Sequence, residues 1–261
     1  MASHFSSIGL PVSCQEEFRE YFEKAYNKGE HIKVSNGTYL KWKVDNEVEL
    51  WGQLNNENEA IGMNPHFFGS ARMNVLIKER VENPKDNELD GAFYAWSGNA
   101  EDNGYPFVFD VPDIWTYNNI KLPQVVVLQL SAFAHEIKGF ETEKEYFEAQ
   151  EGEMKFAVES FIPSGLFNPD GKSTIPPTAN AIFSGRIIDT QKRTNTHTNS
   201  EYVWAKVSVL GNELDVVTDP KIIEGKLVKG GVLNGSFWLS GRIVGNFEKE
   251  RNSFWKKLIG R

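Results

Sequence analysis

The sequence predicts an α+β protein that is mainly β, with an N-terminal antiparallel meander or sheet domain carrying two short helices and a C-terminal OB-like small β-barrel. Three observations predict this class. Polar and apolar residues alternate along most of the apolar segments, turn-forming residues separate these segments, and only two segments before residue 150 combine helical spacing with capping residues. A chain of 261 residues is also longer than one core commonly supports, so we expect two domains.

The first 63 residues predict a helix followed by a meander. Ser13 and Glu16 have the spacing of a capping box, and aromatic residues then recur at helical spacing until Gly29, so a helix is expected over residues 14–28. An Asn36-Gly37 pair is typical of a hairpin turn. The meander strands are expected at residues 31–35, 38–44, 48–54 and 60–63.

The middle of the chain predicts further strands and a break. Strands are expected at residues 73–81, 92–96, 106–111, 125–133 and 155–161. The run 125–128 has no polar alternation, which is typical of a central strand covered on both faces, and Thr142 with Glu145 predicts a second short helix. Pro and Gly concentrate near residues 168–177. We therefore predict a domain over 1–168 and a linker over 169–178.

The C-terminal segments follow an order that resembles the OB-fold. Strands are expected at residues 181–190, 201–210 and 213–218, a short helix at 220–226 and a glycine-punctuated strand at 232–244. Three strands, a helix and a further strand resemble this small Greek-key barrel, which often binds oligonucleotides or oligosaccharides. The OB-like barrel is predicted to occupy residues 179–245, and an amphipathic helix is expected over 246–261.

The composition indicates the cellular compartment and the kinds of partner that we expect. No apolar run is long enough to span a bilayer and no signal peptide is evident at the N-terminus, so we expect a cytoplasmic protein without a membrane partner. The single cysteine, Cys14, agrees with a reducing compartment. The net charge of −8 is uneven, because residues after 178 contain 13 Lys and Arg against 8 Asp and Glu, while residues before them contain 15 against 28. An acidic body joined to a mildly basic unit is expected.

The candidate binding residues lie on the predicted barrel. Period-two alternation places Tyr202, Trp204 and Lys206 outside one strand and Trp238 with Arg242 outside another, and Arg186 falls outside by the same rule. Exposed aromatic rings interleaved with cations are typical of single-stranded nucleic-acid binding. The alternative is that these large residues form the contact surface between the barrel and the N-terminal body.

The sequence predicts no catalytic residue, no cofactor and no metal. His66 and His135 have acids in the same region of the sequence, but no metal-ligand spacing connects them, and we interpret them as structural. Those acids are Asp90, Asp110, Asp113, Glu136 and Glu159. Cys14 has no neighbouring base, Ser164 lacks the glycine that precedes a nucleophile elbow, and no phosphate-cradling Gly-rich loop occurs.

Four blocks of sequence carry a family resemblance. They are Asn64-Pro-His-Phe67, the segments 88–96 and 105–113, and the segment 156–167. Together they resemble a widespread bacterial family of uncharacterised proteins, and the resemblance implies no activity.

Elimination therefore favours a non-catalytic binding protein. We expect it to act through protein-protein contacts, as an inhibitor, immunity or regulatory factor, with an unknown protein partner. Single-stranded nucleic-acid binding through the OB-like barrel is the alternative. An enzyme of another type would need His66 or His135 to meet two of the acids in one cleft.

Overall fold

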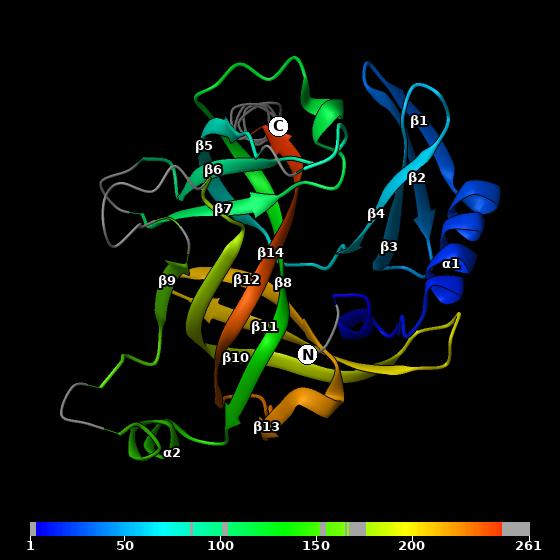
Figure 1. The fold of residues 1–261 in the computed structure, drawn as a ribbon. Helices are drawn as coiled ribbons and strands as arrows, with labels where there is room; N and C mark the ends of the chain where they lie inside the picture. Colours follow the sequence, from blue (N-terminus) through cyan, green and yellow to red (C-terminus); the bar gives the residue numbers. More distant parts are fainter. Residues whose placement is uncertain are drawn as a thin grey trace, which may run out of the picture.

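The described part of the chain is mainly β and contains two α-helices and two sheets (Figure 1). The computed structural model describes residues 4–83, 86–100, 104–151, 155–164, 166 and 176–246. One sheet is a four-stranded antiparallel meander, and the other is a large mixed sheet. Of the two parts predicted from the sequence, the meander is therefore confirmed as a sheet of its own.

The smaller sheet is built from the N-terminal hairpins. Its strands follow chain order and are β1 (Glu30–Val34), β2 (Gly37–Lys43), β3 (Val48–Leu54) and β4 (Ala60–Phe67). Helix α1 (Gln15–Lys28) packs against β2 and β3. The predicted capping box is wrong, because Cys14 occupies the N-cap and the Ser13 backbone N–H instead donates to the Glu17 carboxylate at 2.6 Å.

The larger sheet contains ten strands that come from both halves of the chain. They are β5 (Met73–Val81), β6 (Ala92–Ser97), β7 (Pro106–Asp110), β8 (Gln124–Phe140), β9 (Ser160–Ser164), β10 (Asn180–Thr194), β11 (Glu201–Val209), β12 (Asn212–Thr218), β13 (Ile223–Gly225) and β14 (Val232–Asn246). Helix α2 (Glu143–Glu148) follows β8, and the Thr142 hydroxyl accepts from the Glu145 backbone N–H, as the capping pattern predicts.

Two long strands organise this sheet. β8 and β14 pair antiparallel along most of their length and run side by side through the middle of the molecule (Figure 1). β10 pairs with β14, β12 pairs with β8, and β11 pairs with both β10 and β12, so these three strands link β14 to β8. β5 pairs with β8, β7 pairs with β14, and β6 pairs with both β5 and β7, which makes a second link. The pairings therefore form two closed circuits that share β8 and β14. The run 125–128 belongs to β8, whose residues 126–134 are all buried, as expected for a central strand.

Two apolar clusters form most of the core. One lies within the large sheet and includes Phe109, Phe183 and Phe237. The other joins α1 and the small sheet to the large sheet through residues such as Trp42 and Phe67. In the sequence, β8 precedes the predicted linker 169–178 and β14 follows it, so the large sheet contains strands from both predicted domains.

Three sequence expectations need correction or fall outside the described residues. The strand expected at 155–161 begins only at Ser160, and the helix expected at 220–226 is a 3-10 turn, Pro220–Ile222, followed by β13, which pairs with β8. The 3-10 turn begins at Asp219, whose carboxylate accepts from the Lys221 backbone N–H. The C-terminal helix expected over 246–261 lies outside the described residues, apart from its first residue, which ends β14.

Candidate functional site

Two of the predicted aromatic residues are buried and do not form an exposed surface. Tyr202 and Trp204 are 2% and 5% exposed, and they pack in the cluster that joins the two sheets. The Trp204 indole N–H donates to Asp215 at 2.9 Å, and the Arg193 guanidinium lies 4.2 Å from the centre of the Trp204 ring. These two rings therefore lie where the small and large sheets meet, which agrees with the alternative of a contact surface with the N-terminal part of the chain and not with an exposed binding face. Alternation separates the two faces of a strand but does not show that a second sheet covers the outer one.

Each of the three predicted cations has a carboxylate partner. Arg186 is exposed and pairs with Glu143 and Glu159. Lys206 lies 3.4 Å from Glu213. Arg242 is largely buried, pairs with Asp113 at 2.8 Å and with Glu49 at 3.3 Å, and lies over the Trp51 ring. Because each of these cations is paired with a carboxylate of the same chain, they do not form a continuous path for phosphates.

Trp238 is also largely buried, at 9% exposed, but its environment differs from that of Trp204. Its indole N–H donates to the Asp110 carboxylate at 2.5 Å, and Phe133 lies against the ring with the centroids 4.9 Å apart. Because Trp204 and Trp238 are both covered, nucleic-acid bases cannot stack on them in this conformation. The single-stranded nucleic-acid alternative thus lacks the exposed surface on which it depended.

A buried polar network lies behind Trp238, between β4 and the pair β8 and β14. The Gln129 amide N–H group faces the Phe67 carbonyl at 3.1 Å and the Ser131 hydroxyl at 2.8 Å, so the Gln129 carbonyl faces His66 Nε2 at 2.9 Å. His66 Nε2 therefore carries the proton, and Nδ1 accepts from the Ser240 hydroxyl at 2.9 Å. Burial lowers the pKa of His66 well below its ordinary value, which keeps the ring neutral.

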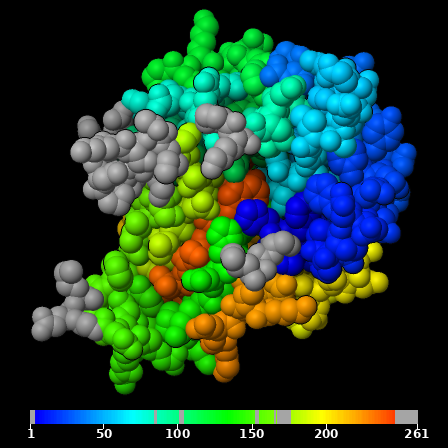
Figure 2. Space-filling view, viewed as in Figure 1, coloured from blue at the N-terminus to red at the C-terminus, as the bar shows by residue number. Residues whose placement is uncertain are grey.

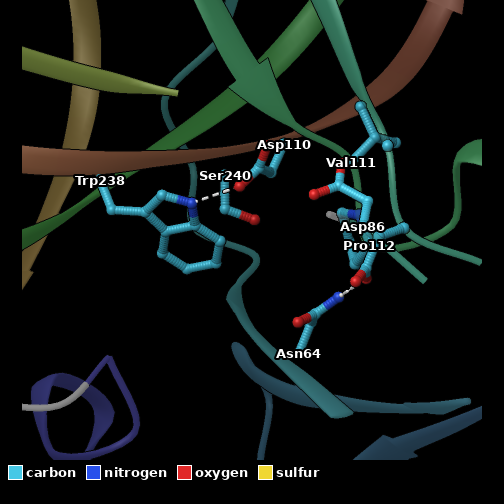
Figure 3. A pocket seen from close by; sticks show the side chains of 9 residues that line it. Asn64, Asp86, Asp110, Val111, Pro112, Trp238 and Ser240 are labelled. Carbon is cyan, nitrogen blue, oxygen red and sulfur yellow. Dashed lines mark hydrogen bonds between the residues drawn. The ribbon is translucent and has the colours of Figure 1, made fainter. Parts of the chain in front are cut away.

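Ser240 and Trp238 line a small acidic cavity (Figure 3). The cavity has a volume of about 100 Å³. We call it the acidic cavity, and it is lined by Asn64, Asp86, Asp90, Gly91, Asp110, Val111, Pro112, Trp238 and Ser240. These residues come from β4, the β5–β6 connection, the end of β7 and β14, so the cavity exists only where the two sheets meet. Figure 3 shows the Trp238 indole directed at Asp110 and the Asn64 amide group below them.

The side-chain hydrogen-bond donors that line the cavity among the described residues are already used. Trp238 donates to Asp110, the Asn64 amide donates to Asp90 at 2.7 Å, and Ser240 donates to His66. Gln53, which lies behind the wall, also donates to Asp90 at 2.8 Å. The lining therefore offers the cavity three carboxylates, an amide oxygen and a hydroxyl oxygen as acceptors. Such a lining favours a donor-rich cation and disfavours an anion.

Asp110 is the most perturbed of the three carboxylates. It keeps partial exposure as a residue, but its carboxyl is enclosed by the cavity wall, and this burial raises its pKa to about 7. The neighbouring Asp86 and Asp90 raise it further, while the hydrogen bond from Trp238 acts in the opposite direction. Burial and Asp90 also raise the pKa of Asp86. The cavity thus contains a carboxyl group whose pKa lies near neutral pH and that a bound cation would hold ionised.

The other acidic and nucleophilic candidates have structural partners. Asp113 pairs with Arg242, and Glu159 accepts from the Ser208 hydroxyl at 3.1 Å. Cys14 is exposed at the start of α1, and Ser164 ends β9. Asp90 and Asp110 do meet, in the acidic cavity, with His66 behind Ser240. Sequence reasoning missed Asn64, Asp86 and Ser240, since none stands in a motif and pairing between distant strands brings them together.

Neither the geometry nor a relative assigns a cofactor. In the described part of the chain, no three His, Cys, Asp or Glu residues are placed to hold a metal ion. No helix among those residues is long and apolar enough to cross a membrane. Comparisons with protein families, with curated proteins and with solved structures find no match to this chain.

Proposed function

We propose that this protein is a non-catalytic binding protein that acts through contacts with a protein partner, and that the acidic cavity receives a lysine or arginine side chain of that partner. The observation that carries the proposal is the set of acceptors in the cavity, whose neighbouring side-chain donors are engaged within the protein. A volume of about 100 Å³ suits an ammonium or guanidinium group and is too small for a drug-sized ligand.

Binding accounts for the cavity better than catalysis does. Ser240, His66 and Gln129 have the connectivity of a nucleophile, a base and an orienting group. However, burial lowers the pKa of His66, so the ring is a weak base, and three carboxylates would oppose the negative charge that develops during acyl transfer. The same carboxylates attract a cation.

The wider charge distribution supports a basic partner. The residues before position 179 contain 28 Asp and Glu against 15 Lys and Arg, and an acidic surface of this kind steers cations toward the cavity. An inhibitor, immunity or regulatory factor is the class that this mode of action fits. We place its action in the cytoplasm, which the presence of only one cysteine in the sequence supports.

A calorimetric titration tests the proposal with small probes. N-acetyl-lysinamide and N-acetyl-argininamide should bind, whereas N-acetyl-norleucinamide, which lacks the charge, should not. Asp110→Asn should weaken binding by about tenfold or more, because a hydrogen bond to a charged group contributes about 1.5–3 kcal/mol. Asp189→Asn removes the same charge from β10, where the Asp189 carboxylate accepts from Thr190 N–H, and should leave binding unchanged. Equal binding of the norleucine compound would contradict the proposal.

The affinity for the same probes should depend on pH. The pKa of Asp110 is raised to about 7, so the carboxyl is mostly neutral below this pH and mostly charged above it. N-acetyl-lysinamide should therefore bind about three- to tenfold more tightly near pH 8 than near pH 6. In the Asp110→Asn protein this difference should largely disappear. Binding that strengthens as the pH falls would have the wrong sign for a carboxylate site.

We also propose that β10, β11, β12, β14 and β8 make up the OB-like unit. The order of the pairings supports this, because three antiparallel strands are followed by a short helical turn and a fourth strand that pairs back to the first. The closing strand is β8, which is parallel to β12 and antiparallel to β14 and which precedes the other four in the sequence. An OB-like unit of this kind would have a permuted strand order.

A further inference from the structure

His4 lies flat on the indole ring of Trp238. The two rings are 4.2 Å apart at an interplanar angle of 6°, and His4 also stacks on His135 with the centroids 5.1 Å apart. The Nε2 atoms of His4 and His135 are 2.8 Å apart, so one ring donates and the other accepts. Burial and the neighbouring His135 lower the pKa of His4 to about 4, which keeps its ring neutral near pH 7.

The two rings that His4 contacts line two hollows along β14. Trp238 lines the acidic cavity together with Ser240. His135 and Ser236 line a groove of about 540 Å³, which we call the β8–β14 groove. It is lined by His135, Glu136, Ile137, Lys138, Ile182, Ile222, Glu224, Asn234, Gly235 and Ser236. In Figure 2 the orange-red surface of β14 lies recessed in the centre of the face, between the green atoms of β8 and the blue N-terminal segment.

The His4 ring contacts Trp238 as the ring of a bound ligand would. Trp238 is held from other sides by Asp110 and Phe133, so it presents a fixed flat surface. His4 itself remains partly exposed, and within the described part of the chain its ring hydrogen-bonds to His135. Aromatic rings gain from stacking on one another beyond the area that they bury, so a ring from another molecule can compete with this contact.

We propose that the space between Trp238 and His135 is a ring-binding slot, that His4 occupies it within the free protein, and that an aromatic side chain of the partner replaces His4. The inference rests on the proposed function and makes the partner more specific. An extended segment places alternate side chains on one face, so an aromatic residue two positions from a basic residue can fill the slot and the acidic cavity together. The β8–β14 groove then provides room for the partner chain to continue.

Three peptides and two variants test this slot by calorimetry. The peptides are acetyl-Phe-Gly-Lys-amide, acetyl-Ala-Gly-Lys-amide and acetyl-Phe-Gly-norleucine-amide. His4→Ala should bind the Phe-Lys peptide about three- to tenfold more tightly than the wild type, because the internal competitor is removed. The Ala-Lys peptide should bind both proteins equally. His31→Ala removes an exposed histidine that contacts the Tyr26 carbonyl, away from the slot, and should behave as the wild type.

The outcomes separate this inference from the proposed function. If the Ala-Lys peptide binds neither protein, the cation site fails, and the norleucine peptide still tests the slot, since it should bind His4→Ala more tightly than the wild type. Equal affinities of wild type and His4→Ala for both Phe peptides would overturn the slot. The indole N–H signal of Trp238 in a proton–nitrogen spectrum shows whether His4→Ala keeps the bond to Asp110, so loss of folding is recognised directly.

Discussion

Replacing Arg242 by methionine is expected to lower the free energy of unfolding by about 3–5 kcal/mol, the typical cost of breaking a buried ion pair. Arg242 neutralises Glu49 and Asp113, which are both 3% exposed. Methionine keeps much of the apolar stem but leaves the two carboxylates without this cation. Lys41, at 3.0 Å from Glu49, can compensate for only one of them. Urea unfolding of the two proteins at neutral pH measures the difference.

Arg186→Met is the matched control for this substitution. Arg186 also pairs with two carboxylates, but its side chain is 46% exposed, so its loss should cost about 0.5 kcal/mol or less. Adding Glu49→Gln and Asp113→Asn to Arg242→Met should recover part of the lost stability, because no buried charge then lacks its partner. Equal losses for Arg242→Met and Arg186→Met would show that the buried ion pairs of Arg242 contribute no more to stability than the exposed pairs of Arg186.

Asp110→Asn is expected to raise the free energy of unfolding by about 4 kcal/mol at pH 7, since the pKa of Asp110 is raised by about three units and each unit corresponds to about 1.4 kcal/mol. The folded protein raises the pKa of Asp110 from 3.8 to about 7, so ionisation favours the unfolded chain between these values. Asparagine has no charge to bury and can still accept from Trp238. The expected gain is therefore largest near pH 7 and above.

The pH dependence of this gain provides the control. Near pH 4 the carboxyl is protonated in the folded state and about half protonated in the unfolded state, so the gain from Asp110→Asn should fall to about 0.5 kcal/mol there. Chemical denaturation at several pH values measures both curves. We infer that the protein is less stable because it keeps a carboxylate in the cavity for a cation. An Asp110→Asn protein that is less stable than the wild type at pH 7 would contradict this inference.

Local sequence signals predicted many of the strands and both helices. The alternation in β2 and β3, the turn at Asn36 and the cap at Thr142 depend on neighbours in the sequence, and the structure contains these elements near their predicted bounds. The pairing of β8 with β14 depends on contacts between residues about 90 to 120 positions apart, for which one sequence holds no local signal. The interval 155–161 was assigned to a strand because it is apolar, yet only its last two residues pair with β10.

The site was harder to predict than the fold, for a physical reason. Trp238 was correctly singled out as a residue that must be covered or bound, but the sequence could not show that Asp110 lies at its indole N–H. Asn64, Asp90 and Ser240 form one wall only because β4 of the small sheet meets β14 of the large one, and that contact is a property of tertiary packing.

The most direct test of a cation site is the indole N–H signal of Trp238 during a titration with N-acetyl-lysinamide. That N–H donates to Asp110, so an ammonium group that binds the same carboxylate should shift the signal progressively to saturation, and N-acetyl-norleucinamide should leave it in place. The shift should be lost in Asp110→Asn. If the signal does not move at any concentration of the lysine compound while wild-type folding is intact, the acidic cavity does not receive a cationic side chain and the proposed function is wrong.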